Sequence, residues 1–226
     1  WNADILVVNH ALFFSDLALR REGASVLPDY DVAIFDEAHT VEAVAGNHLG
    51  VSVTQAQLNY NFNKLYNDRA QRGLLVHHGL KDAQQQVMRL RYLTSDLFDT
   101  IRHWREQCAG ANGRVRQPLP IENNLSPELI QLGQMIGNSA ESLSSDEQKI
   151  ELKAAAERLF GLAIALKTWF QQEVEDAVYW IESSGRDRGL KLTSAPVDVG
   201  PVLRDQLFAE IPTVILTSAT LSVGQQ

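Results

Sequence analysis

The chain has 226 residues and a formal net charge of −8, and its composition of 45% hydrophobic and 21% charged residues is typical of a globular protein with a sizeable core. No apolar run approaches the roughly 20 residues that a membrane-spanning helix requires, and no signal-peptide pattern follows Trp1, so we expect a cytoplasmic protein without membrane association. The single cysteine, Cys108, excludes an internal disulfide bond and indicates a reducing compartment.

The first predicted elements are a strand, a helix and a second strand. Residues 3–8 form an apolar run of strand length, and the helical spacing over residues 9–21 turns Leu12, Phe13 and Leu17 inward. The second strand covers residues 32–36. Because these three elements fit within about 35 residues, they predict a βαβ unit whose two strands lie parallel in one sheet.

The second strand ends in two adjacent carboxylates, within the sequence VAIFDEAH at residues 32–39. P-loop ATPases present their Walker B carboxylates in this way, at the end of a short apolar strand. The pattern therefore predicts ATP and Mg²⁺ as ligands. Asp36 is expected to hold the magnesium ion through a bound water, and Glu37 to act as the base that handles the attacking water. The alternative is a solvated acidic turn.

Between residues 54 and 183 the periodicity becomes helical. Thr54 can cap a first helix, and a long second helix is expected from Ala83 to Cys108, with apolar residues at alternating four- and three-residue steps. Ser126 and Pro127 are expected to open a third helix, and a fourth starts near Asp146. Its apolar stripe contains Leu152, Ala155, Leu159, Leu162, Leu166 and Trp169. Helices with one apolar stripe are stable only when they pack on one another.

Charge is distributed unevenly along this helical region. Residues 54–116 carry ten basic and five acidic side chains, whereas residues 117–183 carry four and eleven. Aromatic residues are interspersed among the basic ones, and single-stranded DNA binds grooves that combine cations with aromatic platforms. The candidates for DNA contact are Arg89, Arg91, Arg102 and Arg105. The alternative for each of them is an ordinary solvated helix surface.

The chain is expected to return to the first sheet near its C-terminal end. Two short strands at residues 178–182 and 190–193 predict a hairpin, and residues 213–217 predict a third strand of the parallel sheet. This strand is followed by hydroxyl groups on Ser218 and Thr220. Because the carboxyl ends of parallel strands meet at one edge of a sheet, we expect Ser218 or Thr220 to lie within hydrogen-bonding reach of Asp36 or His39.

Three segments carry a resemblance to a known family: DILVVNHAL at residues 4–12, FDEAH at 35–39 and LTSATL at 216–221, with a long helical region between the second and the third. This order resembles the XPD/DinG-like iron-sulfur DNA helicases of superfamily 2. The resemblance implies an α/β fold: a partial RecA-like parallel sheet of the P-loop NTPase type in residues 1–53 and 184–226, interrupted by a helical arch domain over residues 54–183.

The resemblance also implies a function for the parent protein and roles for its motifs. The function is ATP-dependent unwinding of DNA in the 5′ to 3′ direction, with a role in repair or structure resolution. The parent would bind single-stranded or forked DNA and act as a monomer. His39 would link the nucleotide site to the motif formed by Thr217, Ser218, Ala219 and Thr220. Asn9 and His10 match the Asn-His of the family; the alternative is that they only cap the first helix.

Two features of the family are missing from the sequence. No Gly-x-x-x-x-Gly-Lys-Ser/Thr phosphate loop occurs in the 226 residues, and a 4Fe-4S cluster needs about four cysteine thiolates, whereas the chain has one cysteine. We therefore expect a fragment of a larger helicase that starts after the cluster. The fragment alone is expected to be inactive, with the phosphate loop and the cluster supplied by the parent.

Two other functions fit parts of the sequence. An RNA-directed DEAH ATPase would share the DEAH motif, but the long helical region directly after it disfavours this class. A non-enzymatic protein-docking module would suit the acidic residues 117–183, with a protein partner on the helical region. A pull-down with that region alone would distinguish this alternative. A zinc site is not predicted, because the spacing of His77, His78, His103 and Cys108 fits no usual zinc motif.

Overall fold

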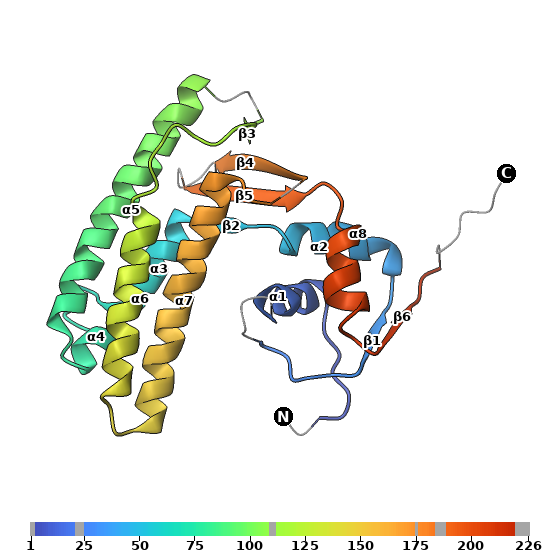
Figure 1. Ribbon diagram of the computed structural model, residues 1–226, viewed down its shortest axis with the longest axis horizontal. Helices are drawn as coiled ribbons and strands as arrows, with labels where there is room; N and C mark the ends of the chain where they lie inside the picture. Colours follow the sequence, from blue (N-terminus) through green and yellow to red (C-terminus); the bar gives the residue numbers. More distant parts are fainter. Residues whose placement is uncertain (1–2, 21–24, 109–111, 175, 184–188, 220–226) are drawn as a thin grey trace. The chain divides into compact units, whose positions relative to one another are not determined.

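The computed structural model describes residues 3–20, 25–108, 112–174, 176–183 and 189–219. It confirms a mixed α/β fold, and the chain separates into two compact units (Figure 1). The first unit contains Trp1–Gly50, Glu175–Val178 and Ala195–Gln226, and the second contains Val51–Val174 and Tyr179–Ser194. None of the helices in the described residues is long and apolar enough to cross a membrane.

A parallel pair of strands forms the sheet of the first unit. β1 (Val32–Phe35) pairs with β6 (Thr213–Leu216) in the register Val32 to Thr213 through Phe35 to Leu216. The backbone N–H of Thr217 donates to the carbonyl of Phe35 at 2.8 Å and continues the ladder beyond the strands. Both predicted strands therefore share one sheet, with their carboxyl ends at the same edge, as expected.

The strand predicted at residues 3–8 is wrong. These residues lie in no strand, and the apolar side chains of Ile5 and Val7 are 83% and 95% exposed. An apolar run becomes a strand only when another strand satisfies its backbone groups and its side chains pack on a neighbour. Within the described residues, the sheet has only β1 and β6, so the predicted βαβ unit is replaced by a segment without regular structure followed by a helix.

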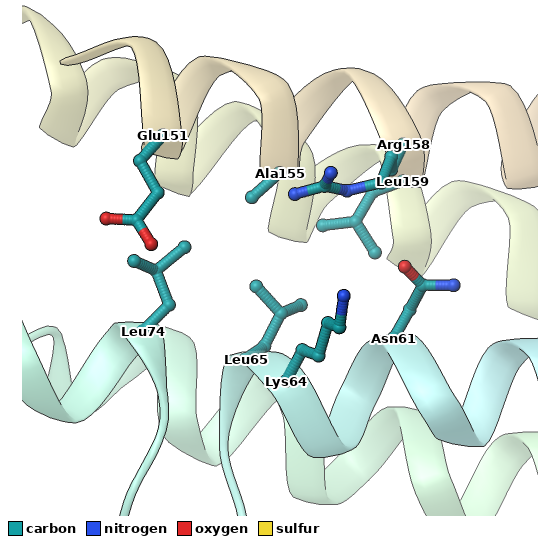
Figure 2. Close-up of a pocket in the computed structure, with 8 residues that line it drawn as sticks. All are labelled: Asn61, Lys64, Leu65, Leu74, Glu151, Ala155, Arg158 and Leu159. Carbon is teal, nitrogen blue, oxygen red and sulfur yellow. The ribbon is translucent and has the colours of Figure 1, made fainter. Parts of the chain in front are cut away.

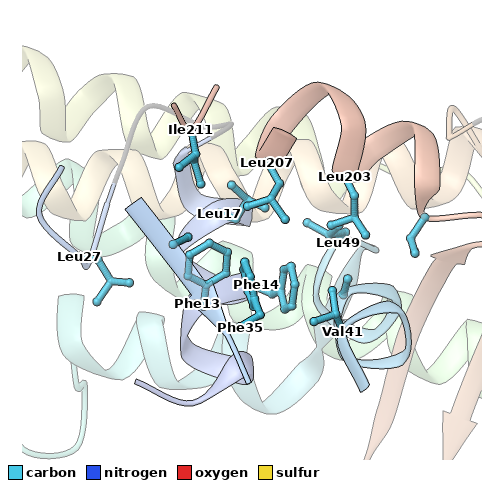
Figure 3. Packing of buried hydrophobic residues seen from close by; sticks show 13 residues of the cluster. Phe13, Phe14, Leu17, Leu27, Phe35, Val41, Leu49, Leu203, Leu207 and Ile211 are labelled. Carbon is cyan, nitrogen blue, oxygen red and sulfur yellow. The ribbon is translucent and has the colours of Figure 1, made fainter. Parts of the chain in front are cut away.

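Aromatic packing builds the core of the first unit around β1 (Figure 3). Helix α1 (His10–Arg20) buries Phe13, Phe14 and Leu17, whereas Leu12, expected inward, is 39% exposed. The ring of Phe35 lies edge-on to Phe13 at 4.8 Å between centroids and stacks on Phe14 at 5.9 Å. Four further elements complete the unit: η1 (Ala38–Thr40), α2 (Val41–His48), α8 (Gly200–Leu203) and the π-helical turn η2 (Arg204–Phe208).

A buried carboxylate fixes residues 26–28, which precede β1. Asp16, whose side chain is fully buried, accepts hydrogen bonds from the backbone N–H groups of Val26 at 2.6 Å and Leu27 at 2.8 Å, and from Arg20 Nε at 2.6 Å. Arg20 in turn donates to the carbonyls of Leu27 and Pro28, both at 2.9 Å. The pair therefore stabilises the chain path that leads into β1.

We expect the substitution Asp16→Asn to lower the stability of the first unit by about 3 kcal/mol at pH 7, because it leaves Arg20 without its buried partner. Burial raises the pKa of Asp16, but hydrogen bonds from Arg20, Leu27 and Val26 outweigh it and hold the pKa below its ordinary value of 3.8. The stabilisation is therefore present above pH 3.8 and is lost as the pH falls through the lower pKa of the folded state.

Urea denaturation at pH 7 and at pH 3 measures this effect. The difference between the wild type and Asp16→Asn should shrink at the lower pH. Asp29→Asn is the matched control, since Asp29 also contacts Arg20, at 3.0 Å, but is fully exposed. Exposed pairs contribute at most about 1 kcal/mol. Equal losses in the two variants would contradict the role given to the buried carboxylate.

The second unit contains five helices in the described residues: α3 (Gln55–Leu65), α4 (Leu74–His77), α5 (Lys81–Cys108), α6 (Leu125–Glu141) and α7 (Asp146–Gln171). Figure 1 shows α5, α6 and α7 side by side. The four predicted helices are confirmed, and all six residues of the predicted α7 stripe are buried. The short helix α4 was not predicted.

Gly133 lies at the α6–α7 contact, where an added Cβ would come within 2.6 Å of the Phe160 ring.

The predicted start of α6, with Ser126 as the cap, is two residues late. The helix begins at Leu125, so Ser126 lies inside the first turn, where it is buried. The backbone N–H of Ser126 donates to Asn123 Oδ1 at 3.1 Å. An Asx side chain that precedes the helix thus satisfies this group, and Ser126 is not the cap. In α3, by contrast, Thr54 accepts the N–H of Gln57 at 2.9 Å and caps the helix as predicted.

A second sheet accompanies the helices. Its strands are β2 (Ser52–Thr54), β3 (Arg114–Val115), β4 (Ala177–Ser183) and β5 (Leu190–Pro196), in the order β2-β5-β4-β3. β4 and β5 are neighbours, as the predicted hairpin requires, and residues 184–188 between them lie outside the described residues. Trp169 Nε1 on α7 donates to the carbonyl of Thr193 at 2.9 Å and ties this sheet to the helices.

Candidate active site

The carboxyl ends of β1 and β6 continue side by side beyond the sheet. The N–H of Ala38 donates to the carbonyl of Thr217 at 2.9 Å, in addition to the bond from Thr217 to Phe35. Two segments of the sequence that lie about 180 positions apart are thereby joined by backbone hydrogen bonds. The side chains of Asp36, Glu37 and His39 lie on one segment, and those of Thr217 and Ser218 on the other.

Asp36 is held as an ionised carboxylate by its neighbours. Its Oδ1 accepts the hydroxyl of Thr217 at 2.9 Å and the backbone N–H of Glu37 at 2.9 Å. These hydrogen bonds, that from Thr217 first, lower the pKa of Asp36 below 3.8, since they stabilise the charged form. Its Oδ2 has no hydrogen-bond partner within the described part of the chain and faces solvent. An exposed, ionised oxygen of this kind can accept a water from a hydrated magnesium ion.

Glu37 has an unusual backbone conformation. Its φ of 49° and ψ of 48° lie in the left-handed region, which costs a residue with a side chain about 1–2 kcal/mol. Its carbonyl accepts two hydrogen bonds from Thr40, one from the backbone N–H and one from the hydroxyl, both at 2.9 Å. These bonds hold the turn after β1 in the strained conformation.

His39 contacts both segments. Its Nδ1 lies 3.2 Å from Glu37 Oε2 and 3.0 Å from Ser218 Oγ. Nδ1 can donate to or accept from the hydroxyl of Ser218, according to the tautomer of the ring. The predicted contact between His39 and Ser218 is confirmed. Thr220, the alternative partner, lies outside the described residues. Ala219 is exposed, and its methyl side chain has no group that could form a hydrogen bond.

Asn9 and His10 separate into two roles. Asn9 Oδ1 accepts the N–H of Leu12 at 2.8 Å, as a helix cap does. The ring of His10 does not cap the helix: its Nδ1 lies 3.1 Å from the hydroxyl of Thr40, 30 positions later. Thr40 was not predicted from the sequence. The signal was its hydroxyl group three positions after Glu37, since such a side chain can hydrogen-bond to the backbone of a turn.

Comparison with known proteins identifies similar sequences over the whole chain. ATP-dependent DNA helicase YoaA of Haemophilus influenzae is 32% identical over 235 residues, which cover 99% of this chain and 33% of that protein. YoaA of Escherichia coli is 29% identical over 99% of the chain. A protein named 3′-5′ exonuclease DinG, of Bacillus subtilis, is 23% identical over 98% of it. The resemblance to the DinG-like helicases is confirmed. No family model matches the chain.

The chain spans about a third of the length of the curated relatives it matches. The residues after β1 fit a hydrated magnesium ion, because they offer one open ionised oxygen on Asp36 and a second carboxylate on Glu37. An iron-sulfur cluster does not fit, since one cysteine cannot ligate it. Within the described residues, no three His, Cys, Asp or Glu side chains gather into a metal site.

Three of the four arginines expected to contact DNA have partners within the second unit. Arg89 pairs with Glu128 at 2.7 Å, and Arg102 pairs with Asp99. Arg91 donates to Asn63 Oδ1 at 2.7 Å and to the carbonyl of Tyr66 at 2.9 Å. For Arg105, Nε is buried without a hydrogen-bond partner within the described residues. A DNA phosphate would therefore compete with internal partners at Arg89, Arg91 and Arg102.

The second unit has a hollow of about 320 Å³ between α3, α4 and α7 (Figure 2). Its polar side chains are Asn61, Lys64, Glu151 and Arg158, and its apolar lining is Leu65, Leu74, Ala155 and Leu159. In Figure 2 the amine of Lys64 and the guanidinium of Arg158 point into the space between the helices. None of the predicted nucleotide-site residues lines this hollow, so the candidate active site is the one at the ends of β1 and β6.

Proposed function

We propose that the chain is the segment of an ATP-dependent DNA helicase that carries the water-handling half of the nucleotide site. The observation that carries this proposal is the hydrogen bond from Thr217 to Asp36, which with the Ser218–His39 contact joins the two motifs across the helical region. Similarity to proteins named DNA helicases over the whole chain supports it, and favours DNA over the RNA-directed alternative.

Each residue has a role in this proposal. Asp36 would hold a hydrated Mg²⁺ bound to the nucleotide, which would supply positive charge that neutralises the phosphates. Glu37 takes the proton of the attacking water. Thr217 orients Asp36, and Ser218 and His39 transmit changes at the nucleotide to the rest of the motor domain. The remainder of the parent would supply the phosphate loop, which this sequence lacks.

We further propose that residues 1–53 and 184–226 belong to motor domain 1 and residues 54–183 to an arch insertion, as the family order implies. In the parent, single-stranded or forked DNA is the substrate, and it is unwound in the 5′ to 3′ direction during repair or structure resolution. The DNA contacts would be Arg89, Arg91, Arg102 and Arg105. The parent acts as a cytoplasmic monomer with a 4Fe-4S cluster outside this chain, and the arch offers a surface for a protein partner.

The full-length protein tests this function directly. We expect ATP hydrolysis that single-stranded DNA stimulates, together with ATP-dependent separation of a forked duplex. Residues 1–226 alone should show neither, because the groups that cradle phosphates are missing. A full-length protein without DNA-stimulated ATP hydrolysis, or turnover by the isolated chain, would overturn the proposal.

The substitution Ser218→Ala should separate hydrolysis from unwinding. It removes a hydrogen bond of His39 but no group at the phosphates, so we expect ATP turnover within about threefold of the wild type. Strand separation should fall about tenfold, the equivalent of one hydrogen bond. Ser95→Ala in α5, whose exposed hydroxyl donates to Asp99, is the control and should change neither rate. Equal losses in both rates of Ser218→Ala would contradict a coupling role.

A further inference from the structure

A line of hydrogen bonds runs from the start of α1 to the turn that carries Glu37. His10 Nδ1 lies 3.1 Å from Thr40 Oγ1, and Thr40 Oγ1 lies 2.9 Å from the carbonyl oxygen of Glu37. A carbonyl only accepts, so the single hydroxyl hydrogen of Thr40 is donated to Glu37. The oxygen of Thr40 must then accept from His10, which therefore carries a proton on Nδ1. The direction of every bond in the line is thereby determined.

The turn that this line reaches is strained. Glu37 has a left-handed backbone, and both hydrogen bonds to its carbonyl come from Thr40. If the turn relaxed to a common conformation, the bond from Cα to Cβ would point elsewhere and the carboxylate would move with it. The orientation of the Glu37 side chain therefore depends on where Thr40 is held.

His10 is itself well anchored. Its ring packs on the buried ring of Phe35 at 5.7 Å between centroids, and it starts a helix whose other face is in the core. Asn9 fixes the same end of the helix through its bond to Leu12. The position of His10 is thus set by the core, and the histidine can transmit that position to Thr40.

We propose that His10 is a positioning residue for Glu37: through Thr40 it holds the strained turn in the conformation that presents the carboxylate to the attacking water. This inference rests on the proposed ATP hydrolysis, in which Glu37 is the base. His10 does not touch the nucleotide in this proposal, so its loss should lower the rate of the chemical step and leave nucleotide affinity unchanged.

Kinetics of the full-length protein test the proposal. We expect His10→Ala and Thr40→Val each to lower kcat about tenfold with the KM for ATP within twofold. His10→Asn, which can place an N–H near the position of Nδ1, and Thr40→Ser, which keeps the hydroxyl, should recover most of the rate. Because the two residues act in one line, the double variant His10→Ala/Thr40→Val should be no slower than Thr40→Val.

The chain offers a matched control. Ser15 and His48 form a second histidine–hydroxyl contact in the same unit, with Nδ1 and Oγ 3.1 Å apart. Among the described residues, neither side chain forms a hydrogen bond with Glu37 or Thr40. His48→Ala should leave kcat within twofold. Three outcomes would each overturn the proposal, since they indicate a general structural effect. They are losses of kcat that multiply in the double variant, a change in KM in place of kcat, and an equal loss of kcat in His48→Ala.

Hydrogen exchange separates this inference from the proposed function. In the full-length protein, His10→Ala should speed exchange of the amides of Ala38 and Thr40 about fivefold, whether or not the wild type hydrolyses ATP. A wild type without turnover, but with this faster exchange in the variant, would refute the proposed function and keep the positioning of the turn. Unchanged exchange would refute the positioning itself, and so would an active wild type with an unchanged kcat in His10→Ala.

Discussion

The substitution Glu37→Gln in the full-length protein is expected to lower ATP turnover by about 100- to 10,000-fold, the contribution of a general base. Glutamine keeps the size of the side chain but cannot take a proton from water. ATP binding should persist, because Asp36 remains available for magnesium and the hydrogen bonds that shape the turn involve only the backbone N–H and carbonyl of residue 37. Steady-state hydrolysis and the affinity for a fluorescent ATP analogue measure the two quantities separately.

Glu42→Gln is the matched control for this prediction. Glu42 is an exposed glutamate in the first turn of α2, five positions after Glu37, without an assigned role at the nucleotide. Its substitution should leave turnover within twofold of the wild type. If Glu37→Gln retained more than half of the wild-type rate, another group would have to handle the water.

The substitution Phe35→Ala is expected to destabilise the first unit by about 3–5 kcal/mol, the usual cost of removing a buried aromatic ring. Phe35 is 2% exposed and packs against Phe13 and Phe14, so the cavity would open at the centre of the core. The affected strand also delivers Asp36 to the site. Hydrogen exchange of the amides in α1 should therefore speed up by at least 100-fold, while α7 in the second unit keeps its protection.

The adjacent residue provides the control. Ile34 lies on the same strand but on its other face, where it is 67% exposed. Ile34→Ala should change the stability of the first unit by at most about 0.5 kcal/mol. Similar losses in Ile34→Ala and Phe35→Ala would show that strand propensity, and not the aromatic core, stabilises this unit.

Patterns that are local in sequence were predicted correctly. The stripe of α7 repeats over about five turns, so its period defines both a helix and its buried face. β1 and β6 are apolar runs bounded by polar residues, and both are strands. Residues 3–8 have the same local pattern and are not a strand, because strand formation depends on a partner that the run itself does not specify.

The site was predicted in outline but not in its hydrogen bonds. Motif order placed Ser218 near His39, since parallel strands bring their carboxyl ends together. The bond from Thr217 to Asp36 depends on the register of β1 and β6, and the bond from His10 to Thr40 depends on how α1 packs on Phe35. Neither register nor packing is encoded in a short motif, so these contacts emerge only from the folded chain.

A structure of the full-length protein with Mg²⁺ and a non-hydrolysable ATP analogue tests the central proposal most directly. We predict that a water bound to the metal ion lies within hydrogen-bonding distance of Asp36, that Glu37 contacts a water facing the terminal phosphate, and that Thr217 still donates to Asp36. A nucleotide bound elsewhere, with Asp36 and Glu37 in contact only with solvent, would contradict it.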